Sequence, residues 1–419
     1  MPPALTPEQR LAIVDRHEAG ETLASIANDM GVHYETVRKW WRISRREGRQ
    51  GVGNRPRKTP GKLRKTPPEI VDLIVRLREE HRNWGVPYLR QQVLADESLS
   101  DETRAQVPSL SSFYRYLRSV EERSPHHPLQ QKVPGASLVQ QAKAPHYLWQ
   151  MDLKEKCTVR GLSQKVSVAN VRDVYSSVTV GAIAFELKRA GTLTGAQMQQ
   201  ALRQCFVSWG LPDILRTDKG SCFIANFPQN GCPSMFTLWL VGLGIKHETI
   251  SHGQVTQNGC VERFNRTYNN LVLRDGPFKG IAELQDVSDT VVDFLNTTYP
   301  SQAGICNGQP PLQAHPEARK PRRRYTPAQE PKLFDLERVD RYLARFIWQR
   351  RADKVGKVSL AGQDYYLGRD TSGLVFDVRF DREDRHLVFT TPDKARSFRR
   401  PALGLEADDI LSIGSATND

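Results

Sequence analysis

The sequence predicts a multidomain α/β protein, with a mixed-sheet core preceded by two helical modules and followed by a small β-barrel. Its 419 residues are too many for one ordinary core, because a domain holds about 150 residues. Apolar residues at helical spacing recur through the first 120 positions, and strand-like runs of Val, Ala and aromatic residues begin near residue 148. Short alternating runs parted by Gly and Asp return after residue 346.

The overall charge indicates a polyanionic partner. The formal net charge is +13, and Lys and Arg gather in segments such as RPRKTPGKLRKTP and ARKPRRRY. Clustered basic residues neutralise phosphates and release counterions when nucleic acid binds. A basic, solvated surface without a specific partner is the alternative. We expect nucleic acid to be the partner.

The cysteines and the hydropathy pattern indicate a cytoplasmic protein. The six cysteines show no CxxC pair and no close Cys/His spacing of a zinc site. The chain has no charged start followed by an apolar signal core, and no apolar run reaches the roughly 18 residues of a membrane span. We therefore expect reduced thiols and no membrane partner.

Residues 1–48 are predicted to form a helix-turn-helix DNA-binding domain. Pro7 can begin the first helix, Thr22 can cap the second, and Gly31 supplies the turn before the third. The third helix of such a motif enters the major groove. Its exposed face presents His33, Tyr34, Arg38, Lys39, Arg42 and Arg45. A three-helix bundle that contacts protein is the alternative.

Residues 49–67 are predicted to be an extended basic linker, because they hold many Gly, Pro, Arg and Lys and few apolar groups. Arg55 and Arg57 resemble an arm that lies in a minor groove, where the negative potential favours inserted arginine. A flexible basic tether explains the same residues equally well.

A second helix-turn-helix-like DNA-binding module is predicted over residues 68–120. Apolar residues from Ile70 fall at helical spacing, and Ser111 or Ser112 can cap a last helix. Arg115 and Arg118 on that helix suit a phosphate-facing surface. A Pro- and Gln-rich linker, residues 121–145, is expected to follow.

The pattern changes to a mixed α/β core over residues 146–316. The predicted strands cover 148–153, 165–174, 177–185 and 214–217, and the predicted helices cover 193–209 and 281–296. Downstream we expect a basic linker and helix over 317–340, the small β-barrel over 341–400 and a flexible tail over 401–419.

Three carboxylates in this core suggest metal-dependent phosphodiester chemistry. Asp152 lies within the first predicted strand, Asp218 follows the last one, and Glu262 opens a predicted helix. Clustered acids repel one another, so a fold that keeps them together needs a hard cation such as Mg²⁺. Two metals about 3.5–4 Å apart stabilise the attacking and the leaving oxygen of a phosphoryl substitution. Surface or capping acids in an inactive domain are the alternative.

Three segments around these acids, LWQMDL, LRTDKGSCF and LGIKHETISHGQVTQNGCVERFNRTY, are similar to the catalytic core of the retroviral-integrase-like Asp-Asp-Glu transposases of bacterial insertion sequences and phage Mu. The later segment YPSQAGICNGQPPLQAHPE also resembles that family. The resemblance covers residues 145–316, and the helical front and the Mu-transposase-like C-terminal region match common flanks. Lys219 departs from the pattern, since Asn commonly follows the second acid.

The resemblance implies an RNase H-like fold in which Asp152, Asp218 and Glu262 bind two Mg²⁺ or Mn²⁺ ions. It implies an enzyme that binds the terminal inverted repeats of a mobile element, hydrolyses the DNA ends to free 3′-hydroxyls and joins them to target DNA by transesterification. The implied partners are double-stranded DNA and further copies of the chain on paired ends, and the sequence leaves open whether a partner ATPase selects the target. The implied location is the bacterial nucleoid.

Neighbouring residues fit this interpretation. Arg263 and Arg266, on the same helix as Glu262, can reach a phosphate, as can Lys219. His247 is interpreted as structural rather than catalytic. Two other functions are open: a catalytically silent DNA-binding regulator of the same fold, and an RNase H-like nuclease that cuts without joining.

Overall fold

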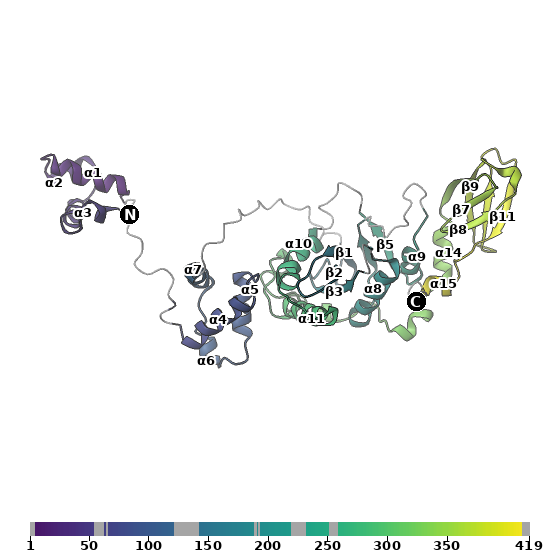
Figure 1. Ribbon diagram of the computed structural model, residues 1–419, viewed down its shortest axis with the longest axis horizontal. Coiled ribbons are helices and arrows are strands. Elements are labelled where there is room, and N and C mark those ends of the chain that lie inside the picture. Colours follow the sequence, from purple (N-terminus) through teal and green to yellow (C-terminus); the bar gives the residue numbers. More distant parts are fainter. Residues whose placement is uncertain are drawn as a thin grey trace. The chain divides into compact units, whose positions relative to one another are not determined.

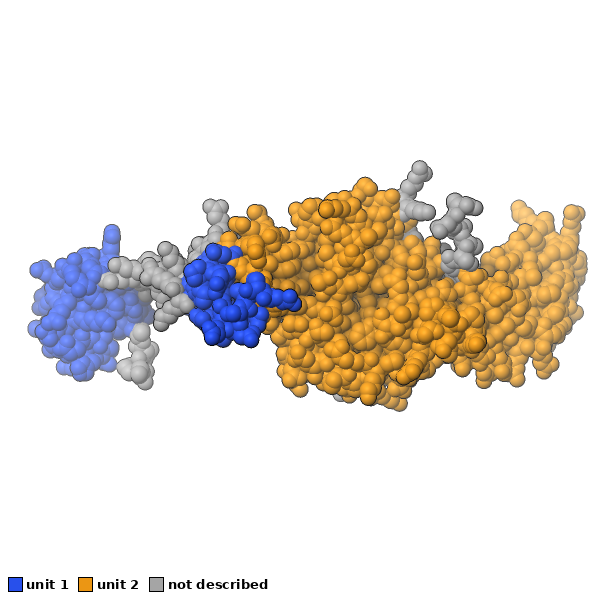
Figure 2. Space-filling view, turned by 90° about the horizontal axis from the view of Figure 1, so that it is seen from below, with its two compact units in different colours: residues 1–72, 97–127 blue, residues 73–96, 128–419 orange. Residues whose placement is uncertain are grey.

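The computed structural model describes residues 5–53, 63, 66–120, 142–187, 191, 193–218, 232–250 and 259–412. The chain divides into two compact units, which are coloured separately in Figure 2. One unit comprises Met1–Asp72 and Glu97–His127, and the other comprises Leu73–Asp96 and Pro128–Asp419.

The first unit begins with three short helices that surround a small apolar core. They are α1 (Pro7–Glu18), α2 (Leu23–Asp29) and α3 (Tyr34–Glu47), followed by the 3-10 turn η1 (Arg49–Val52). The Thr22 hydroxyl accepts a hydrogen bond from the Ser25 amide at 3.2 Å and so caps α2 as predicted. Gly31 has a φ of +62°, which suits glycine in the turn before α3. The core consists of Ile13, Ile26, Ala27 and Val37.

Four helices occupy the region of the second predicted module: α4 (Pro68–Glu80), α5 (Val86–Ala95), α6 (Asp101–Arg104) and α7 (Leu110–Val120). The boundary between the units runs through α4, so α5 belongs to the second unit. There the Tyr88 ring of α5 packs 5.3 Å from Phe294 and 5.6 Å from Tyr299. His81 Nδ1 lies 2.7 Å from an Asp275 carboxylate oxygen. These contacts attach α5 to the core of the second unit.

A five-stranded mixed sheet, the core sheet, forms the centre of the second unit (Figure 1). Its strands are β1 (Leu148–Cys157), β2 (Val166–Asp173), β3 (Thr179–Glu186), β4 (Ile214–Thr217) and β5 (Lys246–Thr249). The strand order is β3-β2-β1-β4-β5, with β1 antiparallel to β2 and parallel to β4. The predicted strands and the mixed sheet are therefore present.

Successive residues of β1 and β2 face opposite sides of the core sheet. Trp149, on one side, packs with its ring 5.9 Å from that of Phe206 in α8 (Gly195–Trp209). On the other side, Asn170 donates a hydrogen bond to Asn265 in α10 (Gly259–Tyr268). Since side chains alternate along a strand, α8 covers an apolar face and α10 covers a polar one. The other main helices of this region are α9 (Met235–Gly242) and α11 (Ile281–Thr297), which lies along β3.

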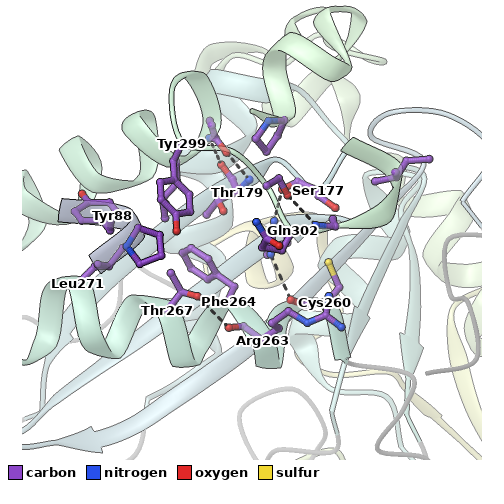
Figure 3. Close-up of a pocket in the computed structure, with 18 of the residues that line it drawn as sticks. Tyr88, Ser177, Thr179, Cys260, Arg263, Phe264, Thr267, Leu271, Tyr299 and Gln302 are labelled. Carbon is purple, nitrogen blue, oxygen red and sulfur yellow. Dashed lines mark hydrogen bonds between the residues drawn. The ribbon is translucent and has the colours of Figure 1, made fainter. Parts of the chain in front are cut away.

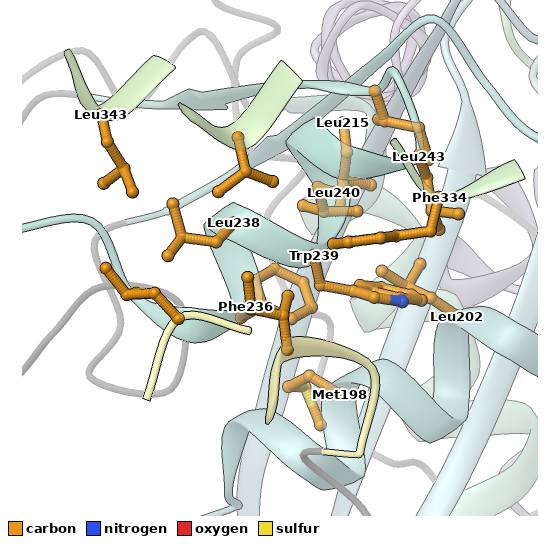
Figure 4. Packing of buried hydrophobic residues seen from close by; sticks show 14 of the residues in the cluster. Met198, Leu202, Leu215, Phe236, Leu238, Trp239, Leu240, Leu243, Phe334 and Leu343 are labelled. Carbon is orange, nitrogen blue, oxygen red and sulfur yellow. The ribbon is translucent and has the colours of Figure 1, made fainter. Parts of the chain in front are cut away.

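Two glycines permit close packing in this core. A Cβ atom on Gly181 of β3 would lie 2.6 Å from the Cys205 sulfur, so α8 approaches the sheet more closely than a side chain would allow. A Cβ atom on Gly242 would lie 2.1 Å from the Phe334 ring. Figure 4 shows Phe334 beside Leu243 and Trp239 in the apolar cluster. Both contacts require the absence of a side chain.

The segment after the core packs onto it. It contains α12 (Pro311–Ala314), α13 (Glu330–Leu333), α14 (Leu336–Leu343) and short 3-10 turns. Glu330, which is 4% exposed, accepts hydrogen bonds from Arg203, Trp239 and Tyr325. Burial alone would raise the pKa of Glu330, but these donors hold it below its usual value. The segment predicted as basic linker and helix is therefore attached to the core through the buried Glu330 side chain.

The C-terminal region forms two sheets. One has the strand order β11-β10-β9-β6 and the other is the hairpin β7-β8, so neither sheet closes in the described residues and the predicted barrel is not confirmed. Alternation predicted strands here, but it does not encode which edges pair. The strands are β6 (Ile347–Arg351), β7 (Lys357–Leu360), β8 (Gln363–Tyr366), β9 (Val375–Asp381), β10 (His386–Thr390) and β11 (Ser397–Pro401).

The last described residues differ from the predicted flexible tail. Ala407–Leu411 forms the helix α15, in which the Ile410 side chain is fully buried. The Arg203 guanidinium donates to the Leu411 carbonyl at 2.9 Å, which ties α15 to α8. Within the described ranges, every helix is too short or too polar to cross a bilayer.

Candidate active site

Strand register places the first two acids side by side. In the parallel pair of β1 and β4, Gln150 is opposite Arg216. Asp152 stands two residues further along β1, and Asp218 stands two residues after Arg216, so a continued register would put both acids at one level and on one face of the sheet. Asp218 is exposed and lies directly after the end of β4. The prediction that both acids point to one edge agrees with this register.

Helix α10 carries the third acid across the polar face of the core sheet. Val261, Phe264 and Tyr268 are buried and hold the helix in place. Glu262 is exposed on the first turn of α10. One turn later, the Asn265 amide donates a hydrogen bond to the Asp152 carboxylate. The helix that carries Glu262 is therefore connected to Asp152 by a hydrogen bond.

Burial opposes the ionisation of Asp152 and of Glu262, and neighbouring negative charge adds to this effect at Asp152. Burial, together with the negative charge of Asp218 and a smaller effect of Glu262, raises the pKa of Asp152 to about 6. Burial also raises the pKa of Glu262. The Asn265 hydrogen bond acts in the opposite direction at Asp152. The site thus keeps acidic groups together at a cost to their ionised forms.

The donor set fits hard divalent cations, although ligand geometry is not assembled. Among the described residues, no three His, Cys, Asp or Glu side chains lie close enough to hold one metal ion. Asp218 adjoins residues 219–231 and Glu262 follows residues 251–258, and both segments lie outside the described residues. Carboxylate oxygens are the ligands that Mg²⁺ and Mn²⁺ prefer, and a cation would offset the repulsion that raises the pKa of Asp152.

Two asparagines form a support for Asp152 that the sequence interpretation missed. Asn170 is fully buried, stands opposite Asp152 in the antiparallel register and donates to the Asn265 side-chain oxygen. This bond orients the Asn265 amide so that its NH₂ group faces Asp152. The spacing of three residues between Glu262 and Asn265 puts both on one helix face and could have indicated Asn265. Nothing in the local sequence indicated Asn170, because its role depends on strand pairing.

A chain of hydrogen bonds through His247 supports the second acid. Thr217 donates its hydroxyl proton to the Asp218 carbonyl at 2.9 Å, so it must accept from His247 Nε2 at 3.0 Å. His247 Nδ1 then accepts from Thr237 at 2.9 Å. Burial lowers the pKa of His247 to about 4, which agrees with the neutral ring that this order requires. The predicted structural role of His247 is thus a specific one.

The predicted DNA-contacting residues fall into three groups. On α3, His33, Tyr34, Lys39, Arg42 and Arg45 are exposed, and half-buried Arg38 pairs with Glu35 at 3.0 Å. Arg115 and Arg118 are exposed on α7, and Arg263 and Arg266 are exposed on α10. Arg55, Arg57 and Lys219 lie outside the described residues. The described members therefore belong to surfaces that can meet a phosphate backbone.

Comparison with known families identifies two domains. A helix-turn-helix domain model matches residues 9–60, and an integrase core domain model matches residues 243–311. The second match includes Glu262 and Asn265. The two models together leave β1, β2, β3 and β4 of the core sheet unmatched and include only β5.

Individual relatives are distant. The chain is 22% identical over 291 residues to the transposase for transposon Tn552 of Staphylococcus aureus, a match that covers 66% of this chain and 57% of that protein. The chain thus spans little more than half the length of this curated relative.

Two solved structures are also similar in part. The HTLV-2 integrase catalytic core domain in complex with magnesium is 21% identical, with a TM-score of 0.31, and the match covers 42% of this chain and 99% of that one. A chain of the simian T-cell lymphotropic virus intasome in complex with the PP2A regulatory subunit B56 gamma is 12% identical, with a TM-score of 0.32, and the match covers 74% of this chain and 96% of that one.

Proposed function

We propose that this chain, a relative of the integrase-like transposases that carries a helix-turn-helix domain and an integrase core domain, cuts DNA at the ends of a mobile element and joins those ends to target DNA. The observation that carries the proposal is the hydrogen bond from Asn265, one turn after Glu262 on α10, to Asp152 of β1, with Asp218 directly after the end of the neighbouring strand β4. We propose an RNase H-like arrangement of the core sheet and its helices, which would account for this placement.

The three carboxylates would hold two Mg²⁺ or Mn²⁺ ions, which when bound supply charge neutralisation to a phosphoryl substitution. Asn265 orients the Asp152 carboxylate through its hydrogen bond, and the chain through His247 fixes the strand end that carries Asp218. Arg263 and Arg266, which are exposed on α10, would bind phosphates of the DNA strand that reaches the acids. Water or a 3′-hydroxyl then meets one preorganised site in both steps.

The helical modules would select which DNA arrives at this site. Exposed residues of α3 suit base edges and phosphates of a terminal repeat, and the arginines of α7 extend the contact. Joining two ends to one target requires more than one copy of the chain, so we propose a homo-oligomer on paired ends. Selection of the target by a partner ATPase stays an expectation.

A strand-transfer assay tests this function. Full-length protein would be mixed with Mg²⁺ and labelled duplexes that carry the inverted repeats flanking its gene. Asp152→Asn should abolish joined products while end binding is kept, because the metal ligand is lost and α3 is untouched. Glu155→Gln, an exposed acid on the same strand, is the matched control and should join normally.

The other outcomes identify the competing functions. Cut ends without joined products would favour a nuclease. Binding without cutting by the wild-type protein, together with no stabilisation by Mn²⁺, would favour a silent DNA-binding regulator and contradict the proposal.

A further inference from the structure

A pocket of about 540 Å³ lies against the side of α10 that carries Cys260, Arg263 and Thr267 (Figure 3). Its walls come from the start of α5, the β2–β3 turn, α10, the end of α11 and residues 301–305. Pockets of this size accept small organic ligands. It shares α10 with Glu262, but the acids and their hydrogen-bonding partners do not line it.

The pocket has an apolar part and a polar, cationic part. Figure 3 shows Tyr88, Tyr299 and Leu271 toward one side and Ser177, Gln302 and Cys260 toward the other. Arg172 and Arg263 are the charged residues among those that line it, and the lining contains no carboxylate. Such a lining favours an anion that carries a flat, apolar body.

The two arginines have different roles. Arg172 donates to the Cys260 carbonyl at 3.4 Å and to the Ser177 carbonyl, and its guanidinium lies 5.4 Å from the centre of the Phe264 ring. Its buried Nε atom has no hydrogen-bond partner among the described residues. Arg263 is exposed, and within the described ranges its guanidinium makes no hydrogen bond or ion pair. Arg172 therefore builds the wall, whereas Arg263 is available to a ligand.

We propose that this pocket receives one unpaired nucleotide of the DNA strand next to the phosphodiester at the acids. The base would enter between the aromatic residues, where stacking is favourable for any base. Gln302 and Asn270 offer amide groups to its edge, and Arg263 would bind its phosphate. A base in a duplex cannot enter a pocket of this size, so the nucleotide must be unpaired.

This inference rests on the proposed function, because only DNA held at the acids would bring a nucleotide to Arg263, the residue after Glu262. An acidic, aromatic peptide has similar chemistry. The shared helix favours DNA, since Glu262 and Arg263 are both exposed on α10 and a strand bound at the first would lie on the helix that carries the second. The pocket would then hold the DNA end open beside the reacting phosphodiester.

Fluorescence of a modified base tests the proposal without catalysis. Full-length protein would be titrated with a generic duplex bearing a single unpaired 2-aminopurine nucleotide at one 5′ end, and with the same duplex made blunt. Wild-type protein should quench the probe on stacking and bind it about tenfold more tightly than the blunt duplex. Arg263→Ala and Thr267→Trp should remove this preference, since the first loses the phosphate contact and the second fills the pocket.

Controls separate the pocket from the fold and from the enzyme activity. Thr290→Trp places the same side chain on an exposed part of α11 and should keep the preference. Gln302→Glu adds a negative charge on an exposed loop residue and should weaken probe binding in a protein with an unchanged melting temperature. Equal binding of both duplexes by the wild type, or an unchanged preference in the pocket variants, would overturn the proposal.

Two results distinguish failure of the nucleotide-pocket proposal from failure of the proposed transposase function. Normal joining with no quenching would reject the pocket and leave the transposase assignment. Quenching without joining in Mg²⁺ would reject the assignment and support the nucleotide site. Displacement of the probe by an acidic aromatic peptide, but not by unlabelled unpaired DNA, would assign the pocket to protein and overturn the proposal.

Discussion

The two faces of the core sheet differ in character, since one is apolar and the other carries the candidate acids. Trp149 and Met151 face α8 in a fully buried apolar layer, whereas Asp152, one residue further on, faces α10 among polar groups. The first face lowers the free energy of the fold by burial. The second face keeps an acid whose ionisation burial and like charges oppose. Adjacent residues of β1 thus serve different purposes: Met151 packs in the apolar core, and Asp152 belongs to the candidate site.

The apolar face should give the largest effect on stability. Phe206→Ala removes a fully buried ring that packs against Trp149 and Trp239, and we expect the free energy of unfolding to fall by about 3–5 kcal/mol. Val207→Ala, at a position that is 55% exposed, is the control and should change little. Urea unfolding measures both. Equal losses would show that α8 does not pack as described.

The polar face should behave in the opposite way. Asp152→Asn removes a charge whose pKa is raised from 3.8 to about 6, and a raised pKa means that ionisation opposes folding above pH 6. We expect the metal-free variant to be more stable than the wild type at pH 7.5 by on the order of 1–3 kcal/mol. A melting temperature below that of the wild type would contradict this assignment.

The contributions of Asp152 and His247 to the pH dependence of stability should oppose each other in the wild type. Variants of each residue should separate them. His247 has a lowered pKa, so its contribution to stability is complete above its unfolded value of 6.5 and is lost as pH falls toward 4. Asp152 acts in the opposite direction, because the free-energy cost of its ionised form in the folded state disappears as pH falls from 6 to 4. Relative to the wild type, Asp152→Asn should lose more stability between pH 7 and 5, and His247→Gln should lose less. Parallel pH profiles from urea unfolding would refute this pairing.

The support of Asp152 by Asn265 should give a smaller, specific effect. Asn265→Ala removes a hydrogen bond that lowers the pKa of Asp152, so that pKa should rise further. Mn²⁺ stabilisation, measured by thermal unfolding, should then require a pH higher by roughly one unit or less. Asn269→Ala, on the following turn, is the control. An unchanged pH midpoint would show that Asn265 does not act on Asp152.

The smallest effect is expected outside the core. Arg42→Ala removes one exposed cation from α3, which should weaken DNA binding and reduce the slope of log affinity against log salt by about one. Fluorescence anisotropy at several salt concentrations measures the slope. Glu47→Ala on the same helix should not reduce the slope, because it removes a negative charge.

Local patterns predicted most elements of the fold. Thr22 and Gly31 mark the start of α2 and the turn before α3, and the strand-like run that ends at Thr217 corresponds to β4. Such signals depend on neighbouring residues alone. Local patterns could not predict whether the C-terminal strands close into a barrel, nor the helix α15. Strand pairing and the packing of a terminal helix depend on residues far away in the chain.

In the candidate site, too, some features follow from the local sequence and others depend on the fold. The sequence by itself determined which acids are the candidates, because Asp152, Asp218 and Glu262 each stand in a distinctive local context. Only the tertiary structure decided what surrounds them. Asn170 reaches the site through antiparallel pairing and an amide on another helix, and His247 reaches Asp218 through Thr217 of a neighbouring strand. A hydrogen bond between distant residues depends on their separation in space, which the order of residues specifies only through the whole fold.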